Sequence, residues 1–145
     1  MATLDISGFD NAPIMKIDNT DIRREITKKC LQAAGKVMEK ELKRTIEAKH
    51  HVVSHDMANA VAQTKVYENI DGGYIEVYPQ GTDSRGVSNS MKHTIINKGA
   101  YNKESGRRWK RDRYQAEAEK KAQAFIQTVM ETQLQVSLRE LGLTD

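Results

Sequence analysis

The sequence predicts an α+β fold in which long N- and C-terminal helices pack on a small antiparallel sheet, with short helices between them. Apolar residues recur at helical spacing over residues 21–49 and again over 114–141. A glycine pair between two apolar segments indicates a hairpin, and the strands do not alternate with the helices. The chain has 145 residues, a size typical of one domain. We therefore expect an N-terminal arm at 1–19 and a single domain at 20–145.

The first long helix is expected directly after the arm, which is interpreted as an extended segment or a short strand. Asp18, Asn19 and Thr20 are favourable N-cap residues, so the helix should begin near residue 21 and continue to about residue 49. At this length it would extend about 40 Å, which is longer than a small compact domain needs. Its apolar stripe consists of Ile22, Ile26, Cys30, Ala34, Val37, Leu42 and Ile46, with Leu31 and Met38 beside it.

A short helix and a hairpin are expected next. Ser54 can cap a helix that runs to about Val61. Residues 65–67 and 74–78 then form the two strands of a hairpin, with Gly72 and Gly73 in the turn. In the second strand Ile75 and Val77 should lie on one face, and the tyrosines and the glutamate between them on the other.

Two loops and two helices complete the predicted domain. A loop at 79–89 leads to a short helix at 90–98, which is expected to bury Met91, Ile95 and Ile96 and to end at Gly99. A second, basic loop covers 100–112. The last helix is expected over 114–141, with Gly142 as its stop. Its apolar stripe consists of Ala118, Ala122, Phe125, Val129, Met130, Leu134, Leu138 and Leu141.

The titratable residues show no specific catalytic pattern, so no enzyme activity and no cofactor are expected. His50, His51 and His55 form the tightest cluster, and a four-residue spacing on a helix suits a metal-binding pair. The Glu that follows the first His in zinc hydrolases is missing, so a structural or solvated role is favoured over a metal site. Cys30, the only cysteine, lies on the buried stripe of a helix, where it is expected to behave as a small hydrophobe.

Basic charge is concentrated before the last helix. The net charge of +3 does not by itself indicate nucleic-acid binding. Residues 103–113, however, hold one tryptophan, two acidic residues and six basic ones. The basic residues and the tryptophan are Lys103, Arg107, Arg108, Trp109, Lys110, Arg111 and Arg113. Arg and Trp anchor protein interfaces and also stack on nucleobases. Docking on a neighbouring subunit, contact with a nucleic-acid backbone and a solvated loop all stay open, and the first two are compatible in a ring around DNA.

The segment YIEVYPQGTDSRGV at 74–87 resembles the middle of siphophage neck proteins, the head–tail joining or tail-completion proteins often labelled "tail component". In that family a long helix, a short helix and a small sheet precede a helix that ends in a glycine-containing turn, like 95–99 here. A loop and a C-terminal helix follow. The likeness covers about residues 21–141. Many relatives carry a proline in the aromatic segment before the last helix, whereas residues 106–114 contain none.

The resemblance implies a structural protein of the phage virion that is assembled in the host cytoplasm. It would form a ring, expected to be a hexamer, between the connector or stopper and the tail tube or tail terminator, with DNA passing through the channel. The basic segment would contact partners or the DNA channel. A second contact loop would consist of Gln80, Gly81, Asp83, Arg85, Gly86 and Val87. No apolar run approaches the roughly 20 residues that a membrane span needs, so no membrane contact is expected.

Three alternatives are retained. A stand-alone cytoplasmic nucleic-acid-binding protein would bind free DNA in a salt-sensitive way, and changing Arg107 and Arg108 to Ala would weaken that binding. A tail terminator ring protein would have a similar small α+β fold. A metal-dependent enzyme would use His51 and His55 and would contain stoichiometric metal.

Overall fold

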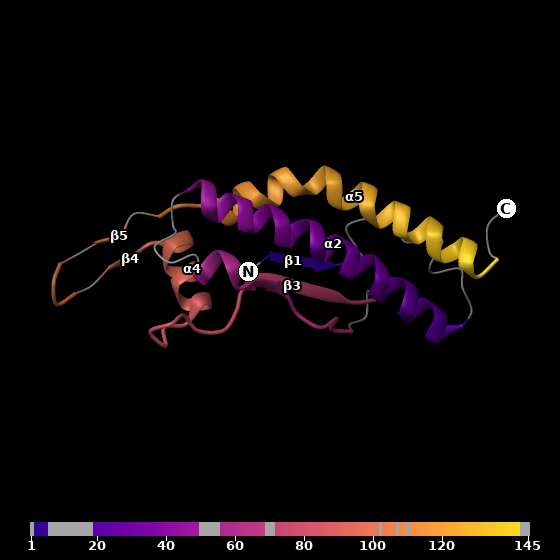
Figure 1. Ribbon diagram of the computed structural model, residues 1–145, viewed down its shortest axis with the longest axis horizontal. Coiled ribbons are helices and arrows are strands. Elements are labelled where there is room, and N and C mark those ends of the chain that lie inside the picture. The colour runs from indigo at the N-terminus through magenta and orange to yellow at the C-terminus, as the bar shows by residue number, and fades with distance from the viewer. Residues whose placement is uncertain are drawn as a thin grey trace.

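The computed structural model describes residues 2–5, 19–49, 56–68, 72–101, 103–106, 108–109 and 111–142. The fold is α+β, and its two long helices pack on a small antiparallel sheet as the sequence predicts (Figure 1). In chain order the elements are β1 (Ala2–Asp5), α2 (Thr20–Ala48), α3 (Asp56–Asn59), β2 (Val61–Gln63), β3 (Tyr74–Pro79), α4 (Asn89–Lys98), β4 (Ala100–Tyr101), β5 (Arg108–Trp109) and α5 (Tyr114–Glu140).

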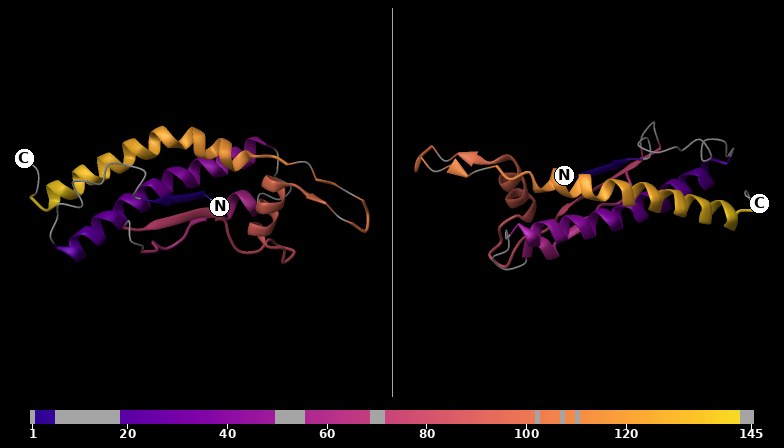
Figure 2. Two further views of the ribbon diagram at one scale, coloured as in Figure 1. Left: turned by 180° about the vertical axis from the view of Figure 1, so that it is seen from behind. Right: turned by 90° about the horizontal axis from the view of Figure 1, so that it is seen from above.

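The long helices α2 and α5 lie side by side and antiparallel along the molecule (Figures 1 and 2). An ion pair joins them near each end: Lys49 Nζ lies 2.9 Å from Glu117 Oε1, and Lys29 Nζ lies 3.7 Å from Glu140 Oε2. The side chain of Asn19 caps the start of α2, as expected. Both helices begin and end within one residue of the predicted bounds, because each has a long apolar stripe and no interior proline.

The buried face of α5 recurs mainly at every fourth residue. The buried members of this series are Tyr114, Ala118, Ala122, Met130, Leu134 and Leu138. A spacing of four moves the stripe about 40° around the helix at each step, so the contact with α2 winds around α5. Part of the predicted stripe is therefore wrong. Phe125 is 65% exposed and Leu141 is 42% exposed, and Val129 is only half-buried.

The main sheet has the strand order β1-β3-β2, with β3 in the centre and both neighbours antiparallel to it. Ile75 and Val77 are fully buried on the face that the long helices cover, which confirms the predicted alternation in β3. Gly35 permits the close approach of α2 to this face. A Cβ at Gly35 would lie 2.6 Å from Ile75 Cδ1, a distance that real side chains do not tolerate.

The first strand of the hairpin lies earlier than predicted. β2 occupies Val61–Gln63 rather than 65–67, and the short helix α3 ends at Asn59. Gln63 pairs with Val77, whereas Tyr67 forms an isolated bridge with Tyr74 that is offset by one residue. This offset is a bulge. The position of β2 was not predicted because this strand has only three residues and directly follows a helix.

The expected N-terminal arm contributes a strand to the sheet. β1 pairs with β3 over its whole length, and Leu4 lies opposite Ile75. Residues 6–18, which belong to the same N-terminal segment, lie outside the described part of the chain. The half-buried side chain of Leu4 packs against both parts of the core between the helices and the sheet.

The most deeply buried side chains of helix α4 are polar. It begins with Ser88 as its N-cap and ends at Gly99, whose φ of 76° favours glycine, close to the predicted bounds. Its fully buried residues are Asn89 and His93, whereas Met91 is 52% exposed. The expectation that Met91 is buried is therefore wrong, whereas Ile95 and Ile96 are half-buried and Ile96 packs against the core.

The predicted basic loop contains a small antiparallel ribbon. Ala100 pairs with Trp109, and Tyr101 pairs with Arg108. The ribbon leaves the body beyond α4 and the start of α5, at the end opposite the C-terminus (Figures 1 and 2). We call residues 100–109 the arm. The loop prediction at 100–112 missed these strands because they have two residues each and lack an apolar alternation.

Candidate partner-binding surface

The two segments predicted to make contacts lie at the same end of the molecule. The loop at 80–88 enters α4, and the arm leaves it, so α4 connects the two (Figure 1). Lys103 and Arg108 of the arm are exposed, as are Arg111 and Arg113 between the arm and α5. Arg107, Lys110 and the side chain of Trp109 lie outside the described part of the structure. The structure thus brings the described basic residues and the second loop to one end of the body.

A set of hydrogen bonds ties the two ends of the arm together, and we call it the arm root. On the main chain, the Asp112 N–H donates to the Ile96 carbonyl at 2.9 Å. Arg111 Nε donates to the Asn97 carbonyl at 3.2 Å. Because Ile96 and Asn97 precede the arm and the other two residues follow it, these bonds fix where the arm leaves the body.

Asn97 also caps α5 from a neighbouring helix. The residue at the N-cap of α5, Arg113, makes no side-chain capping bond. Asn97 Oδ1 accepts the Gln115 N–H at 3.0 Å instead, while Asn97 Nδ2 donates to the His93 carbonyl at 2.8 Å. One side chain of α4 therefore satisfies a free N–H at the start of α5, which is the usual task of a local N-cap.

His93 completes the arm root and is only 1% exposed. Its Nε2 lies 2.7 Å from Gln115 Oε1, and its Nδ1 contacts the Tyr114 hydroxyl. The Gln115 amide nitrogen donates to Glu119 Oε1 at 3.0 Å, which leaves its oxygen to accept from His93. His93 therefore carries its proton on Nε2, and Nδ1 accepts from Tyr114.

Burial keeps His93 and Tyr114 neutral. Desolvation lowers the pKa of His93 to about 4 and raises the pKa of Tyr114. A neutral imidazole with both nitrogens occupied inside the protein serves to join α4 to α5. This role cannot be predicted from the sequence, since His93 and Tyr114 lie 21 residues apart and meet only in the folded protein. Locally, the sequence indicates only that Asn97 follows His93 by four residues, a spacing that places both side chains on the same side of a helix.

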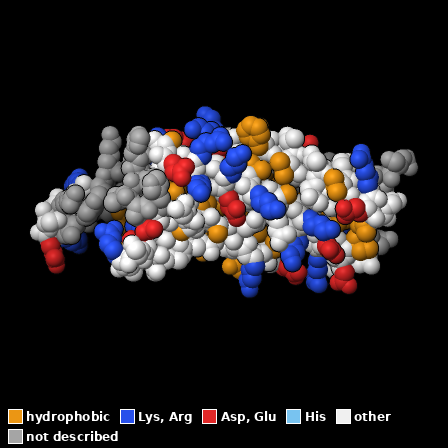
Figure 3. All heavy atoms as spheres, viewed as in Figure 1, with side chains coloured by type: hydrophobic (Ala, Val, Ile, Leu, Met, Phe, Trp, Pro, Cys, Tyr) orange, Lys and Arg blue, Asp and Glu red, His pale blue; other side chains and the backbone are white. Residues whose placement is uncertain are grey.

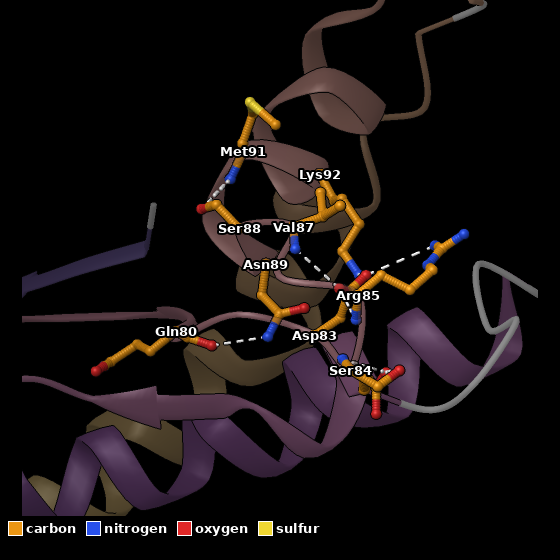
Figure 4. Close-up of polar contacts among 10 residues, drawn as sticks. Gln80, Asp83, Ser84, Arg85, Val87, Ser88, Asn89, Met91 and Lys92 are labelled. Carbon is orange, nitrogen blue, oxygen red and sulfur yellow. Dashed lines mark hydrogen bonds and ion pairs between the residues drawn. The ribbon is translucent and has the colours of Figure 1, made fainter.

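The second contact loop is organised around a buried carboxylate (Figure 4). Asp83 Oδ1 accepts the N–H groups of Arg85 at 2.8 Å and Val87 at 2.9 Å. Asp83 Oδ2 lies 2.9 Å from Lys92 Nζ of α4. The hydrogen bond from Lys92, followed by those from the backbone, holds the pKa of Asp83 well below its usual range.

This organisation divides the predicted loop residues into two groups. Asp83 and Gln80 support the loop: the Asp83 side chain is 1% exposed, and Gln80 donates to the Ala62 carbonyl at 3.0 Å. Gly81, Arg85 and Gly86 are exposed. Val87 is half-buried. The surface that a partner would meet is therefore formed mainly by the backbone of the loop and by Arg85, beside the exposed side chain of Met91.

The remaining candidate groups give no chemical site among the described residues. His50, His51 and His55 lie outside that part. Within it, no group of three or more metal-ligating side chains comes together. Burial raises the pKa of Cys30 to about 11, in keeping with a thiol that acts as a small hydrophobe. No helix in the described ranges has the length and hydropathy to cross a bilayer.

Comparison with known proteins adds no family assignment: no family model, no curated protein and no solved structure matches this chain.

Proposed function

We propose that this chain is a structural subunit of a phage neck, which joins the head connector to the tail as a ring around the DNA channel. The observation that carries the proposal is the basic arm, which extends from one end of a long body and is fixed at its root by partly buried hydrogen bonds. An isolated two-stranded ribbon is only marginally stable in water, so a fixed projecting ribbon suits a segment that binds a neighbour.

The mechanism would be binding rather than catalysis. Subunits would form a ring, expected to be a hexamer, through head-to-tail contacts. The arm and the loop at 80–88 would contact the connector or stopper, the tail tube or tail terminator, or the DNA in the channel. Exposed basic groups such as Lys103 and Arg108 would lie favourably near DNA phosphates. The site of action would be the virion.

The state of the buried polar groups supports a non-enzymatic function. His93 and Asp83 are both held inside hydrogen-bond networks that connect elements of this chain. A catalytic acid or base needs contact with a substrate. In this structure His93 and Asp83 are instead occupied in holding the arm and the loop.

The proposal is tested by removing charge from the arm in an assembling phage. The Lys103→Ala/Arg108→Ala variant should leave heads and tails complete but unjoined. Lys40→Ala/Lys43→Ala removes the same charge from exposed positions on α2 and is the matched control, which should still join them. Electron microscopy of lysates counts joined particles. Normal joining by the arm variant, with the folded protein incorporated, would contradict the proposal.

A stand-alone nucleic-acid-binding protein is the second candidate, and the basic arm is the observation that favours it. In that case the isolated subunit binds free DNA with strong salt dependence, and the arm variant weakens the binding while the α2 control does not. A tail terminator would instead give tails of abnormal length when the protein is removed. These outcomes separate both alternatives from a joining defect.

A further inference from the structure

Helix α5 carries an exposed stretch that is almost free of charge. Between Lys121 and Arg139 the only charged residue is Glu131, in a chain of which 30% is charged. Phe125 is 65% exposed and Val136 is 41% exposed. Figure 3 shows hydrophobic side chains at the surface along the upper edge of the body, where α5 lies. An exposed helix face that carries apolar side chains and almost no charge is suited to contact with another molecule.

Phe125 and Val136 belong to a line of six residues along α5 whose spacing is symmetrical. The line consists of Lys121, Phe125, Val129, Thr132, Val136 and Glu140. Successive members are separated by four, four, three, four and four residues, so they lie on one side of the helix. The spacing reads the same in both directions, while the two end residues carry opposite charges. We call this line the α5 stripe.

We propose that two copies of this chain pair through the α5 stripe, with their α5 helices antiparallel and related by a two-fold axis. In this register Phe125 of each copy lies opposite Val136 of the other, and Val129 lies opposite Thr132. Lys121 of each copy then lies opposite Glu140 of the other, which gives an ion pair at both ends. Such an interface is isologous, because the same surface is used on both subunits.

Charge decides between this arrangement and its parallel counterpart. Parallel pairing would place Lys121 against Lys121 and Glu140 against Glu140, and like charges opposite each other repel. In the antiparallel register the other charged residues from 119 to 141 all lie opposite uncharged positions. These charged residues are Glu119, Lys120, Glu131 and Arg139. Antiparallel helix dipoles also favour this orientation.

A second copy is therefore the occupant that the stripe fits best. Binding of an unrelated partner would require neither the symmetrical spacing nor the opposite charges at the two ends of the stripe. The pairing goes beyond the proposed neck function and does not depend on it, since it concerns the free subunit and uses a surface separate from the arm. Glu140 already lies 3.7 Å from Lys29 of its own chain, and both side chains are solvent-accessible.

The test is the oligomeric state of the purified chain, measured by analytical ultracentrifugation over a range of concentrations. The wild-type protein should be a dimer. Lys121→Glu and Glu140→Lys should each raise the dissociation constant about tenfold, because each turns both ion pairs into like-charge contacts. The double variant should return it to within about threefold of the wild-type value, since both pairs re-form with reversed polarity.

Phe125→Glu should abolish dimers at concentrations where the wild-type protein is paired. Gln123→Glu is the matched control, because Gln123 is exposed on α5 outside the stripe and should leave pairing unchanged. Circular dichroism checks that the variants are folded. A monomeric wild-type protein, a dimer insensitive to Phe125→Glu, or a double variant that is not restored would each overturn the proposal.

The register has a separate test by disulfide formation. A mixture of Phe125→Cys and Val136→Cys proteins should give the mixed disulfide under mild oxidation. Neither protein should cross-link to itself, because like positions are eleven residues apart along the antiparallel pair, or about 16 Å. Cys30 is fully buried and should not interfere. Self-linked products in place of the mixed one would exclude this register.

Discussion

Polar side chains that are buried or half-buried hold the arm end of this protein in place. Asn97 caps a helix to which it does not belong, and His93 uses both ring nitrogens to join α4 to α5. A buried polar group that loses its partner is costly, so each of these side chains favours one arrangement of the arm root. This produces a pH dependence that can be measured.

Lowering the pH from about 6.5 to about 4 should destabilise the protein through His93. In this window the unfolded chain binds a proton at its ordinary pKa of 6.5, whereas the folded chain binds it only near pH 4. The unfolded state therefore holds more protons, and the free energy of unfolding falls by on the order of 3 kcal/mol. His93→Gln should be less stable at pH 7 but should lack this part of the decline.

Urea unfolding between pH 4 and pH 7.5 checks this prediction. His50, His51 and His55 are present in both proteins, so their titration cancels in the comparison. The difference in stability between wild type and variant should shrink as the pH falls. A constant difference would mean that His93 titrates normally in the folded state.

Asp83 should act in a lower pH range. Its folded pKa is depressed by Lys92 and by the loop backbone, so its contribution is present above the ordinary pKa of 3.8 and is lost as the pH falls below it. Asp83→Asn should lower the melting temperature at pH 7 and reduce the acid sensitivity below about pH 4. Thermal unfolding from pH 2 to pH 7 measures both effects, and an unchanged acid limb would contradict this role.

Among the elements, the helices were predictable and the short strands were not. The bounds of α2 and α5 follow from local signals: a cap at Asn19, a long apolar stripe and a glycine stop at 142. β2 and the arm strands have two or three residues each, and their pairing depends on contacts across the chain. The basic composition of the candidate surface was visible in the sequence. Its fixed root was not, because His93 and Gln115 meet only in the folded protein.

Asn97→Ala should loosen the arm root without unfolding the body. The change removes the cap on Gln115 and the bond to the His93 carbonyl, and the loss of a helix cap costs about 1 kcal/mol. Native-state hydrogen exchange should become faster at the Gln115 and Asp112 amides but not in the centre of α2. Equal acceleration in α2 would show instead that the whole fold is destabilised.

For the molecule as a whole, α5 has two apolar surfaces with different purposes. Leu134 is 4% exposed between the long helices, whereas Phe125 on the same helix is 65% exposed. Leu134→Ala should lower the free energy of unfolding by about 2–4 kcal/mol, because it leaves a cavity. Phe125→Ala should change it by less than about 0.5 kcal/mol. Urea unfolding in dilute solution, where association does not contribute, measures both.

The direction in which the arm leaves the body determines how the protein carries a mechanical load. The arm continues the line of α5 away from the far end, where antiparallel α2 begins (Figure 1). Tension between the arm and the start of α2 pulls the two helices in opposite directions along their axes. They must therefore slide past each other along their whole contact before they separate. In optical-tweezer experiments, this geometry should withstand a higher force than one that pulls the helices apart sideways from Lys49 and Glu117. Equal forces in the two directions would show that the interface gives way locally.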